Sequence, residues 1–159
     1  MSHDIKQLKP QADGRYYQGH INPASCKKLF PSQSNQPIIF RSSYERSFIN
    51  WLESNPNVKA WGSECVGIKY KYIDNKVHTY YPDFVVEMMN GDKIVVEIKP
   101  YNQTQKPDMK NDWSTHTYIR NMCKWKAAKE ICEKNGMKFQ IITEKTISKL
   151  GYDFARYTC

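Results

Sequence analysis

The sequence contains no hydrophobic run of the roughly 20 residues that a helix needs to cross a bilayer. Its mean hydropathy is −0.75. The chain opens with Met1–Lys6 and has no apolar stretch behind that start, which is where a signal peptide would carry one. We therefore expect neither a membrane span nor an export signal.

Cysteine is scattered rather than grouped. The chain has five cysteines and no Cys-x-x-Cys pair, so it lacks both the paired spacing of a zinc site and the even count of a disulfide framework. This usage predicts reduced thiols and a cytoplasmic location, with no structural zinc. The five are Cys26, Cys65, Cys123, Cys132 and Cys159.

The composition is that of one basic domain. At 159 residues and 40% hydrophobic content, the chain can bury a core without disulfides or metals. Its 24 lysines and arginines exceed its 16 aspartates and glutamates, which gives a net charge of +8 and a pI near 9.2. This charge suits a polyanionic partner but does not identify one.

Two regions differ in regularity. Residues 1–37 are polar, basic and interrupted by glycines and prolines, and we expect an irregular arm there. Residues 38–159 follow regular patterns and form the predicted folded domain. Ser42 or Ser43 can cap a first helix, which Pro56 would stop.

Beyond this helix the pattern predicts three strands, a long helix, a further strand and a terminal helix. The order α-β-β-β-α-β-α describes an antiparallel meander, followed by a helical crossover that can return a strand in parallel. We therefore expect an α/β fold with a mixed central sheet flanked by helices. The predicted elements are strands 64–72, 77–88 and 93–98, helix 115–135, strand 137–143 and helix 144–150.

Four charged residues stand out among apolar neighbours, where a charge is costly unless it is paired or binds a metal. Glu97 and Lys99 are two residues apart, so they leave the third strand on the same face. Asp83 follows a proline in the second strand, and Glu45 lies on the first helix.

The hairpin turn decides whether Asp83 joins Glu97. A two-residue turn at Asn90-Gly91 pairs residues whose numbers sum to 181, which puts Asp83 on the wrong face. A three-residue loop with a left-handed Gly91 makes that sum 180, so that Asp83 faces Glu97. The hypothesis of a shared site requires the three-residue loop.

Two carboxylates opposed across neighbouring strands repel each other unless a cation lies between them. The hard oxygens of Asp83 and Glu97 suit Mg²⁺, with Mn²⁺ as an alternative, and the backbone carbonyl of Ile98 could add a ligand. Lys99 would offer positive charge to an attacking water and to the transition state. Glu45 could complete the metal site, hold a second ion or orient the nucleophile. The set suits metal-assisted cleavage of a phosphodiester, which also explains the basic charge.

Each of these residues also has a structural explanation. Ser42-x-x-Glu45 has the spacing of a capping box, which would make Glu45 structural, although a capping glutamate can still lie at a site. Glu97 and Lys99 could form an edge-strand salt bridge, and Asp83 could merely start a strand.

Other residues near these elements are weaker candidates. Glu64 could add a ligand, although a surface position is favoured. Glu87 shares its strand face with Asp83 but is four residues along, roughly 13 Å away and too far to share a metal. Trp125 can stack on a base, although packing is favoured. The basic residues around it are explained as a solvated helix face; they are Arg120, Lys124, Lys126 and Lys129.

A set of short motifs runs through residues 38–147. They are Arg41-Ser42-Ser43-Tyr44-Glu45, Asn55-Pro56-Asn57-Val58, Trp61-x-Ser63-Glu64, His78-x-Tyr80-Tyr81-Pro82-Asp83-Phe84, Glu97-Ile98-Lys99-Pro100, Gln105-x-Pro107 and Phe139-x-Ile141-Ile142-Thr143-Glu144. Taken together they resemble the PD-(D/E)xK nuclease superfamily, which includes the endonuclease subunit of heteromeric transposases. Within it, the head-completion nucleases of T-even-type tailed phages are the closer match.

This resemblance implies a restriction-endonuclease-like fold and a Mg²⁺-dependent deoxyribonuclease that acts as an endonuclease, with additional exonuclease action left open. By resemblance, Asp83 and Glu97 would be metal ligands, Lys99 the catalytic lysine and Glu45 the helix acid. The family also implies trimming of packaged DNA at a filled head before a tail joins. DNA, phage head or portal components, and the host cytoplasm are therefore the expected partners and location.

Two other functions remain open at this point. One is a non-catalytic, DNA-binding head–tail joining protein on a nuclease fold, whose binding would ignore EDTA and fall steeply with salt. The other is a junction-resolving or restriction-like endonuclease, which would strongly prefer branched DNA or one sequence. The sequence predicts no particular oligomeric state.

Overall fold

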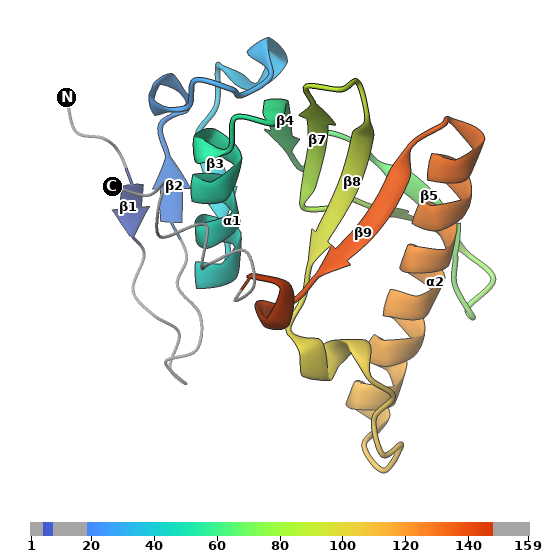
Figure 1. The fold of residues 1–159 in the computed structure, drawn as a ribbon. Coiled ribbons are helices and arrows are strands. Elements are labelled where there is room, and N and C mark those ends of the chain that lie inside the picture. The colour runs from blue at the N-terminus through green and yellow to red at the C-terminus, as the bar shows by residue number, and fades with distance from the viewer. Residues whose placement is uncertain (1–4, 8–18, 148–159) are drawn as a thin grey trace.

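The computed structural model describes residues 5–7 and 19–147 (Figure 1). Its centre is a four-stranded sheet in which three strands run antiparallel and the last joins in parallel. The strands are, in sheet order, β4 (Val58–Ser63), β7 (Phe84–Met88), β8 (Lys93–Ile98) and β9 (Lys138–Ile142). The helices are α1 (Ser43–Ser54), before β4, and α2 (Asp112–Lys134), between β8 and β9. The predicted α/β class with a mixed, helix-flanked sheet is confirmed.

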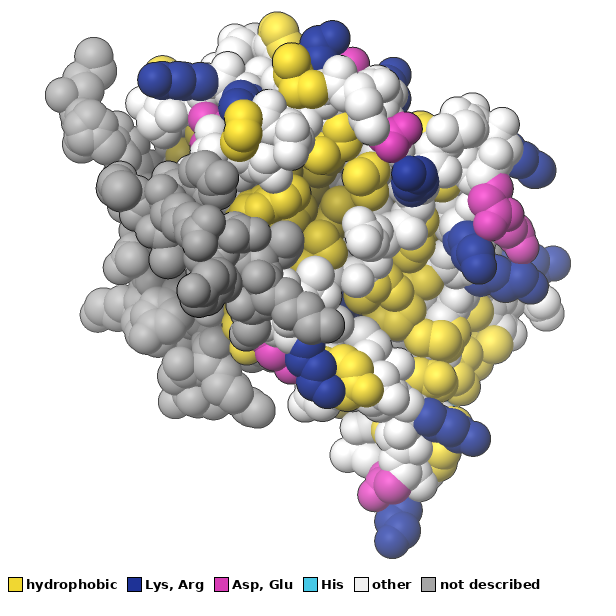
Figure 2. Space-filling view, viewed as in Figure 1, with side chains coloured by type: hydrophobic (Ala, Val, Ile, Leu, Met, Phe, Trp, Pro, Cys, Tyr) yellow, Lys and Arg dark blue, Asp and Glu magenta, His cyan; other side chains and the backbone are white. Residues whose placement is uncertain are grey.

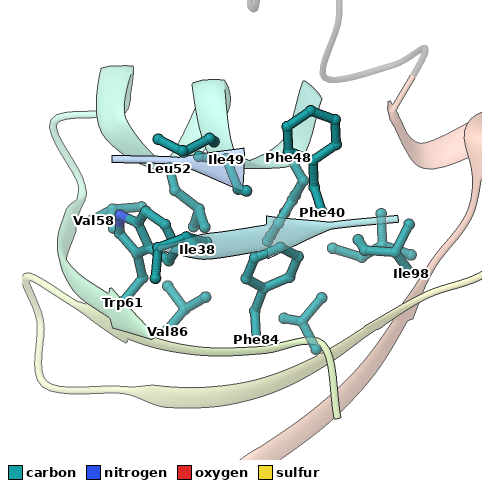
Figure 3. Packing of buried hydrophobic residues seen from close by; sticks show 13 residues of the cluster. Ile38, Phe40, Phe48, Ile49, Leu52, Val58, Trp61, Phe84, Val86 and Ile98 are labelled. Carbon is teal, nitrogen blue, oxygen red and sulfur yellow. The ribbon is translucent and has the colours of Figure 1, made fainter. Parts of the chain in front are cut away.

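Helix α1 covers one face of this sheet (Figure 3). It begins where predicted, because the Ser42 hydroxyl accepts a hydrogen bond from the N–H of Glu45 at 3.1 Å. The helix buries one stripe of apolar side chains against alternate residues of the strands. This cluster includes Phe48, Ile49 and Leu52 of α1 and Trp61, Phe84, Val86, Val96 and Ile98 of the sheet.

Helix α2 lies on the opposite face. The alternate strand residues Val85 and Val95 turn toward it and pack with Cys132. Trp125 is 7% exposed and packs in the core, as the sequence favours. Gly136 follows the helix with a φ of +67°, the left-handed conformation expected where it ends.

The first strand of the sheet is one that the sequence pattern misses. The predicted strand 64–72 is correct only in part: β5 (Ile68–Lys71) is shorter, and it pairs with β6 (Val77–Tyr80) in a separate two-stranded sheet. The edge strand is β4 instead. Gly62 within β4 resembles a break, but a Cβ at this position would lie 2.6 Å from the Phe30 ring, so close packing requires glycine.

The predicted strand 77–88 is two strands rather than one. β6 ends at Tyr80 and β7 begins at Phe84. Between them Pro82, which is fully buried, has no N–H to donate to a sheet ladder. The break carries the chain from the β5–β6 hairpin into the central sheet and leaves Asp83 immediately before β7.

Part of the N-terminal arm is more regular than expected. A small antiparallel sheet contains β1 (Ile5–Gln7), β2 (Gly19–Ile21) and β3 (Ile38–Phe40), and Ile21 is buried in the same cluster as α1. The described residues also contain short 3₁₀ helices: η1 (Pro23–Ser25) and η2 (Pro31–Gln33) in the arm and η3 (Tyr101–Thr104) after β8. The division of the chain at residue 37 stays a prediction.

The predicted helix 144–150 is described only in part. Residues 144–147 form a helical turn, and the rest of the prediction lies outside the described residues. In the part of the chain that the structure describes, no helix is both long and apolar enough to traverse a bilayer.

On the face seen in Figure 2, hydrophobic side chains form a band across the centre, whereas lysine and arginine side chains lie mostly toward the edges. On this face the lysine and arginine side chains of the described residues are therefore not gathered into one basic surface.

Candidate active site

The β7–β8 hairpin has the register that a shared site requires. Phe84 pairs with Val96 and Val85 with Val95, so that the paired residue numbers sum to 180. Gly91 in the connecting loop has a φ of +94°. The predicted three-residue loop is therefore confirmed, and this register places Asp83 across from Glu97.

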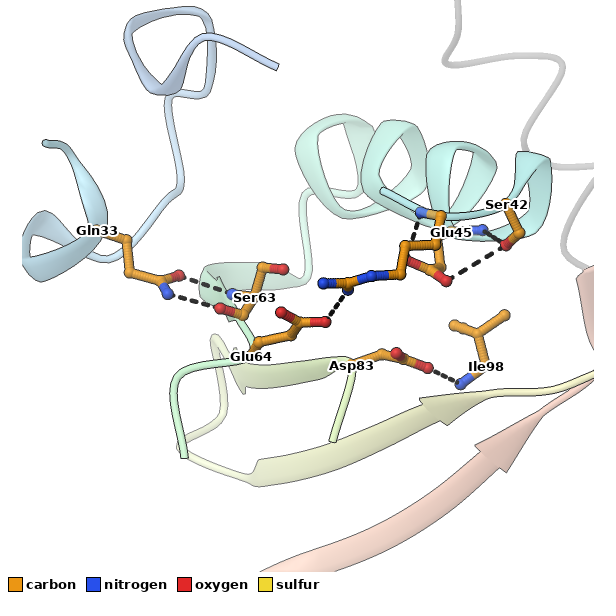
Figure 4. Close-up of polar contacts among 8 residues, drawn as sticks. Gln33, Ser42, Glu45, Ser63, Glu64, Asp83 and Ile98 are labelled. Carbon is orange, nitrogen blue, oxygen red and sulfur yellow. Dashed lines mark hydrogen bonds and ion pairs between the residues drawn. The ribbon is translucent and has the colours of Figure 1, made fainter. Parts of the chain in front are cut away.

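Asp83 is anchored to the neighbouring strand. Its Oδ2 accepts a hydrogen bond from the backbone N–H of Ile98 at 2.7 Å (Figure 4). Burial, followed by the negative charge of Glu97, raises the pKa of Asp83 to about 7, while the Ile98 N–H and the charge of Lys99 oppose this rise. Asp83 is thus a carboxyl whose ionisation is opposed by its surroundings at neutral pH.

Glu97 is buried beside a hydroxyl and an ammonium group. The residue is 7% exposed, and the Tyr80 hydroxyl donates a hydrogen bond to its Oε2. The Nζ of Lys99 lies 3.7 Å from Oε1. Burial raises the pKa of Glu97, whereas Tyr80 and the positive charges of Lys99 and Lys124 lower it. The two carboxylate oxygens therefore have different partners.

Glu45 has both a structural and an electrostatic role. Its Oε2 accepts a hydrogen bond from the N–H of Arg41 at 3.1 Å, one residue before the Ser42 cap, so the contact differs from a standard capping box. Burial and the charge of Asp83 raise the pKa of Glu45 to about 7, which Arg41 opposes. The helix acid thus belongs to the same electrostatic cluster as Asp83 and Glu97.

Glu64 lies beside this cluster rather than at a remote surface. It forms an ion pair with Arg41 (Figure 4), and its charge contributes to the raised pKa values of Glu45 and Asp83. Gln33 in the arm fixes the preceding residue: its Oε1 accepts from the N–H of Ser63 at 2.7 Å, and its Nε2 donates to the Ser63 carbonyl at 2.6 Å. By contrast, Glu87 pairs with Lys59 at 3.6 Å and is not part of the site.

Lys99 lies between two hollows in the surface. One, of about 230 Å³, is lined by the start of α1, including Glu45, and by Ile98 and Lys99. The other, a groove of about 780 Å³, is lined by Lys99, by residues of α2 and by the turn after β5. The Lys99 side chain is about one-quarter exposed, so a ligand in either hollow can reach its ammonium group.

Two residues near the cluster were not identified from sequence as site residues. Tyr80 lies within a quoted motif, but nothing in the pattern shows that its hydroxyl reaches Glu97. Lys124, interpreted from sequence as part of a solvated helix face, has its Nζ 5.5 Å from the centre of the Tyr80 ring. Burial and the charge of Lys99 lower the pKa of Lys124. Only the folded arrangement of α2 against β6 could reveal these contacts.

Two comparisons relate the chain to known proteins. The family model described as TnsA-like endonuclease N terminal matches residues 55–144. The chain belongs to the TnsA-like endonuclease family. The head completion nuclease of Enterobacteria phage T4 is 36% identical over 126 residues, which cover 72% of this chain and 84% of that protein. Both resemblances expected from the motifs are confirmed.

The matched region of the TnsA-like domain contains Asp83, Glu97 and Lys99, whereas Glu45 precedes it. Within the described residues, no three aspartate, glutamate, histidine or cysteine side chains are arranged to hold a metal ion as they stand. The donor chemistry nevertheless fits a divalent cation. Asp83 and Glu97 offer hard oxygens, and their raised pKa values show that nearby positive charge does not compensate their burial.

Proposed function

We propose that this TnsA-like protein is a divalent-metal-dependent DNA nuclease that hydrolyses phosphodiester bonds. The observation that carries the proposal is the register of the β7–β8 hairpin, which puts the half-buried Asp83 across from the buried Glu97, with the Nζ of Lys99 3.7 Å from Glu97. Membership of an endonuclease family and a net charge of +8 support the same assignment.

In this proposal Asp83, Glu97 and the carbonyl of Ile98 would hold Mg²⁺ or Mn²⁺. When bound, such an ion polarises the scissile phosphate and lowers the pKa of a water. Lys99 would direct its ammonium group toward the phosphate oxygens, where negative charge develops as water attacks phosphorus and the bond to the leaving oxygen breaks.

Glu45 and Tyr80 would support these groups in different ways. The Glu45 carboxylate can accept a hydrogen bond from a water and orient it in the hollow that it shares with Lys99. The Tyr80 hydroxyl donates a hydrogen bond to Oε2 of Glu97, which leaves Oε1 beside the ammonium group of Lys99. Tyr80 is therefore a positioning residue, and Glu45 would act directly on the nucleophile.

We propose further that the protein trims packaged DNA during virion assembly, at a filled head before tail joining, and contacts head or portal components there. The support is its 36% identity to the T4 head completion nuclease over most of both chains. Endonuclease action follows the family description, and trimming of a DNA end would add exonuclease action.

The test is a cleavage panel of supercoiled, linear and branched DNA, each with Mg²⁺, Mn²⁺ or EDTA. We expect cleavage with either ion and none with EDTA. Asp83→Asn and Lys99→Gln should each lose about 100-fold or more in rate. Glu87→Gln, in β7 of the same hairpin, and Lys93→Gln, at the end of β8 away from Lys99, are the matched controls and should retain activity.

Each other outcome of the panel has a definite meaning. An Asp83→Asn variant that cleaves as fast as the wild type would refute the assignment of the site. DNA binding without cleavage, unaffected by EDTA, would indicate a non-catalytic joining protein. A strict requirement for branched DNA or for one sequence would indicate a junction-resolving or restriction-like enzyme.

A further inference from the structure

A groove beside the candidate active site contains aromatic and basic side chains that the proposed chemistry does not use. It lies between the N-terminal half of α2 and the turn after β5, and it reaches Lys99. Its volume of about 780 Å³ exceeds that of the hollow beside Glu45. The groove is therefore a candidate path for substrate to the active site.

One face of α2 lines this groove over its N-terminal three turns. The residues recur at intervals of three and four, the spacing of one helix face. From the first to the last of them the helix rises about 16 Å, enough for several nucleotides at about 3.4 Å each. They are Trp113, His116, Thr117, Arg120, Asn121 and Lys124.

The charges in the groove favour an anionic ligand. Arg120, Lys124 and Lys99 contribute three cations, whereas Asp74 is the one acid among the residues that line it. Asp74 is already engaged, because its Oδ2 lies 2.9 Å from Nε2 of His78. Arg120 is held in place: its guanidinium lies 4.2 Å from the centre of the Tyr72 ring. The groove thus presents ordered positive charge.

Trp113, at the outer end of the groove, is 75% exposed. A tryptophan this exposed is unusual, since the side chain is highly buried in most proteins. The other three tryptophans of the chain are partly or fully buried; they are Trp51, Trp61 and Trp125. The Trp113 indole is therefore free to stack against a flat ligand, and an adjoining row of cations would bind the phosphates attached to that ligand.

We propose that this groove binds a single, unpaired DNA strand, with a base stacked on Trp113 and phosphates on Arg120 and Lys124. A base within a duplex is stacked on its neighbours and offers no free face to an indole, whereas an unpaired base does. The inference rests on the proposed nuclease function and specifies its substrate: DNA with an unpaired segment, such as a frayed end or a flap, whose strand leads to Lys99.

The test measures binding in EDTA, so that no cleavage occurs. A fluorescein-labelled oligothymidylate of about 12 nucleotides is compared with a fully paired, blunt-ended duplex of the same length. Trp113→Ala should weaken single-strand binding about ten-fold and leave duplex binding unchanged. Trp113→Phe should retain most of the affinity because it keeps a stacking ring. Ile131→Ala, which removes an exposed apolar side chain further along α2, is the matched control and should bind as the wild type does.

Two further measurements sharpen this test. Intrinsic fluorescence should be quenched when the wild type binds the oligothymidylate, and most of that quenching should be lost in Trp113→Phe. Arg120→Gln should remove about one phosphate contact, so the slope of the logarithm of the binding constant against the logarithm of salt concentration should become shallower by about one. Lys129→Gln, at an exposed position of the same helix, should leave this slope unchanged.

Normal single-strand binding by Trp113→Ala, or an equal loss for single strand and duplex, would overturn the proposal. The proposal would also be overturned if Trp113→Ala bound DNA normally but no longer bound a head protein, because Trp113 would then contact a protein partner. The outcomes also separate the two proposals. If cleavage depends on Asp83 but Trp113→Ala binds single-stranded DNA normally, only the proposal about the groove is refuted. Single-strand binding that depends on Trp113, without cleavage under any metal, refutes only the nuclease.

Discussion

Replacing Asp83 by asparagine should make the protein more stable at alkaline pH. The pKa of Asp83 in the folded protein is about 7, above its ordinary value of 3.8. Between these values the folded state binds more protons than the unfolded state, so this group contributes stability that is fully present at low pH and is lost as the pH rises through about 7. Asparagine removes the ionisation, and its amide oxygen can still accept the hydrogen bond from Ile98.

The size of the effect follows from the two pKa values. They differ by about 3, and each pH unit corresponds to about 1.36 kcal/mol, so ionising Asp83 costs about 4 kcal/mol at pH 8. At pH 4 the folded-state carboxyl is protonated, and the difference from asparagine should fall below about 1 kcal/mol. For a chain of this length, the gain at pH 8 corresponds to a rise in Tm of roughly 10 °C.

Urea unfolding in EDTA at pH 4, 6 and 8, followed by circular dichroism, measures this difference. Glu87→Gln is the control: its carboxylate pairs with Lys59 at 3.6 Å near the surface, so the substitution should change stability by less than about 1 kcal/mol at each pH. Added Mg²⁺ should stabilise the wild type at pH 8 more than Asp83→Asn. The reasoning is refuted if Asp83→Asn is no more stable than the wild type at pH 8, or if its advantage is equal at pH 4 and pH 8.

Three further predictions concern packing and positioning. Tyr80→Phe leaves the buried Oε2 of Glu97 without its donor, so it should cost about 1–3 kcal/mol in urea unfolding and weaken Mn²⁺ binding; wild-type values for both would contradict the positioning role. Gly62→Ala places a Cβ 2.6 Å from the Phe30 ring and should cost about 1–3 kcal/mol; an unchanged urea midpoint would show that the arm packs elsewhere. Ser42→Ala removes the α1 cap and should lower stability by about 1 kcal/mol, a loss that Ser42→Asp should largely restore.

The sequence predicts best where local chemistry determines the structure. The cap at Ser42 and the stop before Pro56 bound α1 correctly, since both act within one turn. The three-residue loop at Gly91 fixes the β7–β8 register; the sequence leaves this loop and a two-residue turn both open, and only the hypothesis of a site shared by Asp83 and Glu97 favours the loop that the structure has. The parallel return of β9 follows from the helical crossover.

Prediction from sequence fails where distant segments determine the structure. β4 is not recognised from sequence, and its Gly62 is explained only by packed neighbours, since a Cβ there would lie 2.6 Å from the Phe30 ring and 2.9 Å from both the Gln33 and Cys65 side chains. β5 and β6 have good strand patterns, yet they pair with each other outside the central sheet. Lys124 looks like any lysine of a solvated helix until α2 brings it over Tyr80.

The central claim is that Asp83 and Glu97 hold a divalent ion next to Lys99. Titration with Mn²⁺, followed by electron paramagnetic resonance, tests it without reference to any substrate. We predict saturable binding by the wild type and by Glu87→Gln, and a loss of about ten-fold or more in affinity for Asp83→Asn and for Glu97→Gln. Equal Mn²⁺ binding by all four proteins, or none by the wild type, would contradict the claim.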